Sequence, residues 1–178
     1  MEPLPVVAIK RALSVIVYCL FFLGTGLTQS PVLTATRAHY RNACESPQTE
    51  RIVLDFIAST EALKSTSADP ALIKAMNATA NMMLAESMVN PFSKLQQFTE
   101  WKAPLESAIA EKPDHPELRL LRLSIQWTVP FFLDYSSEME EDAERVRQAL
   151  SDGYWSDDPE HAAFVLTFLQ HVRDDHSK

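Results

Sequence analysis

The sequence predicts an all-α protein of about seven helices, packed as antiparallel hairpins behind an N-terminal signal segment. The first observation is that the 178 residues include only three glycines, which leaves few positions for the positive φ angles of tight β-hairpins. The second is that six prolines follow residues that can cap a helix or approach one, and proline favours the first helical position. The third is that apolar residues recur at helical spacing, whereas no segment alternates as a strand does.

The N-terminal segment has the three parts of a secretory signal peptide. Lys10 and Arg11 precede a short apolar run, residues 12–27, with two glycines near its end. A basic start, an apolar centre and small residues before the cut are typical of such signals. We therefore expect residues 1–29 to be a signal peptide, and residues 30–178 to form a single α-helical domain that is periplasmic or secreted. In the alternative, residues 12–27 remain uncleaved and anchor the exported domain in a membrane.

Prolines and capping residues give the expected helix boundaries in order along the chain. Six dipeptides place proline behind a candidate N-cap residue: Ser30-Pro31, Ser46-Pro47, Asp69-Pro70, Asn90-Pro91, His115-Pro116 and Asp158-Pro159. A seventh start is the capping-box pattern Ser137-x-x-Glu140. The expected helices span residues 31–45, 47–62, 70–87, 91–112, 116–128, 137–151 and 159–173.

Side-chain patterns support individual helices. The 47–62 helix has an apolar face formed by Ile52, Val53, Phe56 and Ile57. The 137–151 helix has an apolar face formed by Met139, Ala143, Val146 and Leu150. Acidic residues fill its first turn and arginines lie nearer its end, as the helix dipole prefers. Pro104 lies inside the 91–112 helix and should kink or split it, because proline leaves a carbonyl group unbonded.

The spacing of the helices leaves two architectures open. From residue 47 onward, helix starts recur every 21 to 25 residues, which is typical of an array of helix pairs such as tetratricopeptide repeats (TPRs). The helix pairs share little sequence similarity, so an irregular α-helical bundle is the alternative. In both, short connections predict that consecutive helices pack as antiparallel hairpins.

A set of short motifs occupies the middle of the chain between Asn90 and Tyr135. They are Asn90-Pro91-Phe92, Lys94-Leu95, Phe98, Lys102, Leu105-Glu106, Ala108-Ile109, Pro113, Glu117, Arg119, Leu121-Arg122-Leu123-Ser124-Ile125-Gln126, Pro130, Phe132-Leu133 and Tyr135. In these motifs the sequence resembles a family of short, exported bacterial α-helical proteins of unknown function. The resemblance implies the all-α fold and export, and it implies no activity. Trp101 and Asp134 depart from the pattern, since glycine is expected at both positions.

Part of the same stretch is also similar to a TPR. Leu105, Ala108 and Pro113 have the order found in the second helix of a repeat. Pro116 and Glu117 follow where the next repeat would begin. This similarity implies TPR-like helix hairpins.

Charge and residue content exclude several classes of function. The chain has 24 acidic and 16 basic residues, a net charge of −8, whereas a nucleic-acid partner requires a basic surface. Residues 134–178 hold 12 acidic and 4 basic residues and should present an acidic face. Cys44 is the only cysteine after the signal segment, so no internal disulfide is expected. Because the histidines lack metal-ligand spacing and no catalytic pattern is present, we expect no cofactor and no enzymatic activity.

The expected helix 116–128 carries an unusual polar stripe. Stepping about 100° per residue puts Arg119, Arg122 and Gln126 within about 60° of one another. Apolar residues fill both flanks: Leu120, Leu123 and Trp127 on one, Leu118, Leu121 and Ile125 on the other. A helix that is apolar on two flanks packs on two sides, so this helix is expected to be central.

Two arginines on a central helix lose water and need hydrogen-bond acceptors. In the structural interpretation, carboxylates of the same domain meet both arginines, the candidates being Glu106, Asp134 and Asp142. In the functional interpretation, the two arginines and Gln126 line a groove and bind an external carboxylate, phosphate or acidic peptide end.

Two functions of different classes follow. The first is an exported protein-interaction module of TPR-like hairpins that holds a peptide or another envelope protein in a concave groove. The alternative is a binder of a small anionic ligand, or an enzyme accessory, that uses Arg119, Arg122 and Gln126. A membrane is an expected partner only if the N-terminal segment stays uncleaved.

We expect the mature N-terminus to lie between residues 27 and 31, because the apolar run ends there. Mass spectrometry of the protein isolated from its native envelope measures this start directly. A soluble cytoplasmic protein that still begins with Met1 would contradict export.

Overall fold

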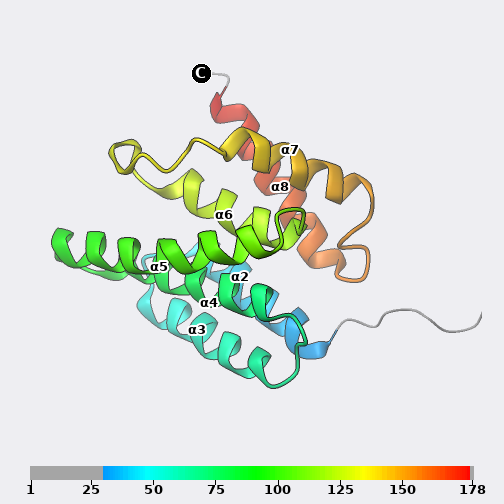
Figure 1. Cartoon of the computed structure of the whole chain (residues 1–178), viewed down its shortest axis with the longest axis horizontal. Coiled ribbons are helices and arrows are strands. Elements are labelled where there is room, and N and C mark those ends of the chain that lie inside the picture. The colour runs from blue at the N-terminus through cyan, green and yellow to red at the C-terminus, as the bar shows by residue number, and fades with distance from the viewer. Residues whose placement is uncertain (1–29, 177–178) are drawn as a thin grey trace, which may run out of the picture.

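The computed structural model describes residues 30–176, and within this range the chain is helical with no strand (Figure 1). The elements are α2 (Pro31–Glu45), α3 (Glu50–Lys64), α4 (Pro70–Leu84), the 3-10 turn η1 (Ala85–Ser87), α5 (Pro91–Glu111), α6 (Pro116–Thr128), the 3-10 turn η2 (Phe131–Leu133), α7 (Met139–Ser151) and α8 (Pro159–His176). The all-α prediction is confirmed. The expected signal peptide or anchor, residues 1–29, lies outside the described residues.

Most helix starts follow the proline and capping signals. The carboxylate or amide oxygens of Asp69, Asn90 and Asp158 each accept a backbone N–H from the first turn of their own helix, at 2.9 to 3.2 Å. Ser30 and His115 also precede helices, and neither makes a side-chain cap bond. At those two starts, proline at the first helical position marks the boundary.

Two expected starts were wrong. Pro47 lies in a turn, because the backbone N–H of Ser46 still bonds to the carbonyl of Asn42 and closes α2. Proline is common just after a helix end as well as at a start, and α3 begins only at Glu50. Ser137 does not cap α7, because its hydroxyl donates to the neighbouring carboxylate of Glu138 at 2.7 Å.

Of the two outcomes expected at Pro104, a kink or a split, the split was wrong. The α5 helix runs unbroken through Pro104, from Pro91 to Glu111. Glu100, whose carbonyl loses its usual partner, is an exposed residue, and water can satisfy a carbonyl at a helix surface. One further difference is that α4 ends at Leu84 and its last expected turn is the 3-10 turn η1.

Packing favours an irregular bundle over an open array of repeats. Consecutive helices from α2 to α5, and again from α6 to α8, pack against each other as hairpins. However, α8 also contacts α2, so the two ends of the described chain meet, whereas each unit of a solenoid touches only its neighbours. One contiguous apolar core draws residues from every α-helix.

The α6 helix is central, as its two apolar flanks predict. It lies between α4 and α5 on one side and α7 on the other (Figure 1). Every residue from Glu117 to Gln126 is buried, including five polar or charged ones. The core therefore contains charges that must be neutralised inside the domain.

The connection from α6 to α7 turns at Asp134. This residue ends η2 in the left-handed region, with φ 47°, a conformation that glycine adopts without strain. Asp is one of the few other residues that tolerate it. A glycine at this position would adopt the same backbone angle without strain.

None of the helices within residues 30–176 combines the length and apolar composition needed to cross a membrane.

Candidate functional site

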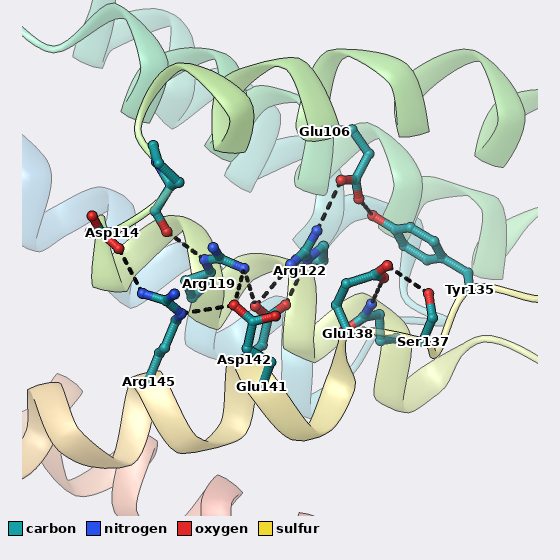
Figure 2. Close-up of polar contacts among 12 residues, drawn as sticks. Glu106, Asp114, Arg119, Arg122, Tyr135, Ser137, Glu138, Glu141, Asp142 and Arg145 are labelled. Carbon is teal, nitrogen blue, oxygen red and sulfur yellow. Dashed lines mark hydrogen bonds and ion pairs between the residues drawn. The ribbon is translucent and has the colours of Figure 1, made fainter.

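Arg122 lies at the centre of the polar stripe that α6 presents toward α5 and α7 (Figure 2). Its Nε and Nη2 atoms donate to the two carboxylate oxygens of Asp142 at 2.6 and 2.9 Å, which forms a bidentate pair. Its Nη1 atom donates to Glu106 Oε2 at 2.9 Å. Burial alone would lower the pKa of Arg122, but the hydrogen bonds and charges of Asp142 and Glu106 raise it above its ordinary value.

Arg119, one turn earlier, binds the same carboxylate. Its Nη1 atom donates to Asp142 Oδ1 at 2.8 Å, and its Nε atom donates to the carbonyl of Pro113 at 2.7 Å. Asp142 is fully buried and the two arginines are only 6% and 5% exposed, so water competes weakly for these bonds. The structural interpretation of the stripe is confirmed, with Asp142 and Glu106 as acceptors. Asp134, the remaining candidate acceptor, is exposed.

Gln126 ends the stripe and also bonds to its own chain. Its Nε2 atom donates to Glu138 Oε2 at 3.3 Å. Nearby, the hydroxyl of Tyr135 donates to Glu106 (Figure 2), and burial raises the pKa of Tyr135 so that the phenol keeps its proton. The side chains proposed to bind an anion, those of the two arginines and Gln126, thus donate to groups of the domain itself, and these contacts give an external anion no support.

A second buried charge network lies on the opposite side of α6 and joins this helix to α2 and α8. Arg37 donates from Nη2 to Glu117 Oε2 at 2.5 Å and from Nε to Oε1 at 3.2 Å. Trp155 Nε1 donates to Glu117 Oε2 at 2.8 Å. His161 Nε2 lies 3.2 Å from Glu117 Oε1, and Asp158 Oδ2 lies 3.7 Å from Arg37 Nη1. All five side chains are buried.

Glu117 is the anion that this second network is built around. Burial alone would raise the pKa of its carboxyl group, but His161 and Arg37 together hold that pKa far below its usual range. Sequence reasoning missed the network. The only feature of the sequence that indicated it was an acidic residue, Glu117, among leucines on a predicted helix. Nothing near Arg37 in the sequence indicated its role, because its partner lies 80 residues away.

An apolar groove of about 750 Å³ opens at the C-terminal end of α6, and we refer to it as the α6-end groove. It is lined by the end of α2 (Cys44, Glu45, Pro47), the end of α4 with η1 (Met82, Met83, Ala85, Glu86), the start of α5 (Pro91, Phe92, Lys94, Leu95, Phe98), the end of α6 and the segment after it (Ser124, Ile125, Trp127, Thr128, Val129, Pro130, Phe132, Leu133), and α8 (Phe164, Thr167, Phe168, His171). Its volume falls in the range of ligand-binding clefts.

The hydroxyl groups that line the groove are already engaged. Ser124 donates to the carbonyl of Leu121 at 2.8 Å. Thr128 and Thr167 donate to carbonyls of their own helices at 3.1 Å. These hydroxyl groups therefore have no hydrogen left to donate to an occupant, whose carbonyl groups must find other partners.

Large apolar side chains are exposed beside the groove. This apolar rim consists of Val89, Phe92, Leu95, Phe131 and Phe132. Phe92 and Phe132 line the groove and are still 84% and 79% exposed. The start of α5 and the turn after α6, which carry the rim, lie at the same end of the bundle (Figure 1). Clustered exposed apolar residues of this kind mark interaction sites.

The groove lining includes one cysteine, Cys44. Cys44 is a free thiol at its edge. Burial raises the pKa of the Cys44 thiol to about 12, so the reactive thiolate does not form near neutral pH. Among the described residues no three His, Cys, Asp or Glu side chains are grouped so that they could hold a metal ion.

The sequence matches no protein-family model, and neither a curated protein nor a solved structure is significantly similar to it.

Removing the Arg122 side chain should strongly destabilise the fold, because Asp142 would remain buried without its bidentate partner. We expect Arg122→Ala to lower the free energy of unfolding by about 3–5 kcal/mol. Arg122→Lys should also destabilise, since an ammonium group cannot reproduce the fork of a guanidinium. Chemical denaturation measures both. Arg147→Ala is the matched control, because this arginine is half exposed and its one ion pair within residues 30–176 is with Glu144. Equal midpoints for Arg122→Ala and the parent would contradict the structural role of the stripe.

Glu117 should make stability depend on pH in the acid range. Its folded-state pKa lies below the ordinary value of 4.5, so its contribution is fully present above that pH. The contribution is lost as the pH falls from 4.5 toward the lowered folded-state pKa. Glu117→Gln cannot titrate, and at pH near 7 it should be less stable than the parent by about 3–5 kcal/mol.

Urea unfolding at a series of pH values, followed by the emission of buried Trp155, measures this difference. The gap between the parent and Glu117→Gln should narrow below pH 4.5. Glu144→Gln, an exposed substitution on α7, serves as the control and should parallel the parent. A gap that stays constant down to acid pH would show that Glu117 is not held ionised in the folded state.

Proposed function

We propose that this protein is an exported α-helical interaction module that holds the apolar face of a partner helix in the α6-end groove. The observation that carries the proposal is the continuity of an apolar groove with an exposed apolar rim at one end of the bundle. The partner is a segment of another envelope protein or a peptide. As a binding module, the protein carries no catalytic step of its own.

The state of the polar groups in the groove supports a helical partner over an extended one. An extended peptide brings backbone C=O groups that need donors, and the groove hydroxyls already donate their hydrogens to their own helices. A helix satisfies its backbone internally and offers only side chains. Leucine and aromatic residues at positions i, i+3 or i+4, and i+7 would enter the groove.

The width of the apolar surface supports a helix over a single acyl chain. Phe131 and Val89 are 92% and 96% exposed, and neither lines the groove itself. A single chain buried in the groove would leave both in water, whereas a helix lying along the rim can cover them. Burial of aromatic anchors commonly dominates the affinity of such interfaces.

The alternative function, binding of a small anion by Arg119, Arg122 and Gln126, has weaker support. Asp142 and Glu106 already neutralise the two arginines. Since an added anion would have to displace buried carboxylates from both, we place the binding site at the α6-end groove.

A designed amphipathic peptide of about 20 residues, with leucine and phenylalanine on one face, tests the proposal. It should bind the purified protein and change the emission of Trp127, which lines the groove. Phe132→Ala should weaken binding about tenfold, as expected for loss of one aromatic anchor. Leu54→Ala is the control, since Leu54 is an exposed apolar residue on α3, away from the groove. Absence of binding, or equal effects of the two substitutions, would refute this function.

A further inference from the structure

The charges around the α6-end groove indicate which charge its partner should carry. The C-terminal ends of α2, α4 and α6 all line the groove. Each helix C-terminus carries about half an elementary negative charge from its unpaired carbonyls. None of these three helices has a basic residue in its last turn to offset that charge.

The groove has little positive charge of its own. The opposing helix end is the N-terminus of α5, where the side chain of Asn90 already accepts a backbone N–H. Lys94 is the one lysine or arginine among the lining residues. Its Nζ atom lies 3.8 Å from the carboxylate of Glu86 and donates to the Glu86 carbonyl at 3.2 Å, so its charge is largely compensated.

Glu45 is the remaining carboxylate of the groove lining, and its negative charge is poorly stabilised when no partner is bound. It is the last residue of α2, exposed, and it makes no ion pair within the described residues. A negative side chain at a helix C-terminus is repelled by the helix dipole. A cation brought by a partner would relieve that repulsion.

We infer that the partner helix is basic, with Lys or Arg flanking its apolar face and lying against Glu45 and the helix ends around the groove. This inference rests on the proposed function and names the chemistry of its partner. The charged ends of these side chains reach the carboxylate, and their aliphatic parts pack over apolar side chains of the groove lining. The net charge of −8 also steers a basic partner toward the protein.

The same charges disfavour an anionic occupant. A fatty acid or an acidic helix would bring a carboxylate next to Glu45 and the carbonyl ends of three helices. Such like-charge contacts are repulsive and oppose binding.

Two designed peptides with the same leucine and phenylalanine face test the inference, one with lysines and one with glutamates on the polar face. Calorimetry with the purified protein should give an affinity about tenfold higher for the lysine peptide at low salt, and added salt should reduce the difference. Glu45→Gln should lower the affinity for the lysine peptide several-fold and should not lower the affinity for the glutamate peptide. Glu144→Gln makes the same charge change on α7, which does not line the groove, and should leave both affinities unchanged.

The outcomes separate this inference from the proposed function. Equal binding of both peptides, or equal effects of Glu45→Gln and Glu144→Gln, would overturn the basic partner and leave the helix-binding groove intact. Tighter binding of the glutamate peptide would do the same. Failure of both peptides to bind, or displacement of both by palmitate at lower concentration, would overturn the proposed function together with the inference.

Discussion

The neutralisation of charges on α6 is the constraint on which the rest of this structure depends. A central helix with arginines on one side and a glutamate on the other can be buried only if opposite charges surround it. Asp142 and Glu106 supply them on one side, and Arg37 supplies the main one on the other. Because these partners come from α7, α5 and α2, the ion pairs help to fix the positions of these three helices relative to α6.

The buried charge networks and the proposed binding surface lie at different places along α6. The buried networks occupy the length of α6 from Glu117 to Gln126, where their donors and acceptors are turned toward each other. At the C-terminal end of the helix no charged network continues, and the space between helix ends is lined mainly by apolar side chains. Among the described residues, the groove is thus a place where the bundle leaves apolar surface uncovered, and this is why we propose it as the binding site.

Local signals in the sequence accounted for most helix boundaries and for the character of α6. The helix starts behind Asp69 and Asn90 depend on contacts within one helical turn. A short stretch of sequence is therefore sufficient to predict them. The same signals were wrong at Pro47 and Ser137, where a proline after a helix end and a hydroxyl bonded to its neighbour resemble a start. Whether such a proline or serine marks a helix start depends on which backbone groups nearby still lack a hydrogen-bond partner. The neighbouring helix determines which groups these are.

The sequence by itself determined that the chain is all-α, that α6 is central and that its arginines need internal acceptors. These properties depend on local propensity, periodicity and the cost of burying charge. Only the tertiary structure decided that Asp142 is shared by two arginines, that Arg37 meets Glu117 across 80 residues, and that five separate segments enclose an apolar groove. Each of these requires the relative placement of distant helices, and that placement is set by packing over the whole core rather than by any local pattern.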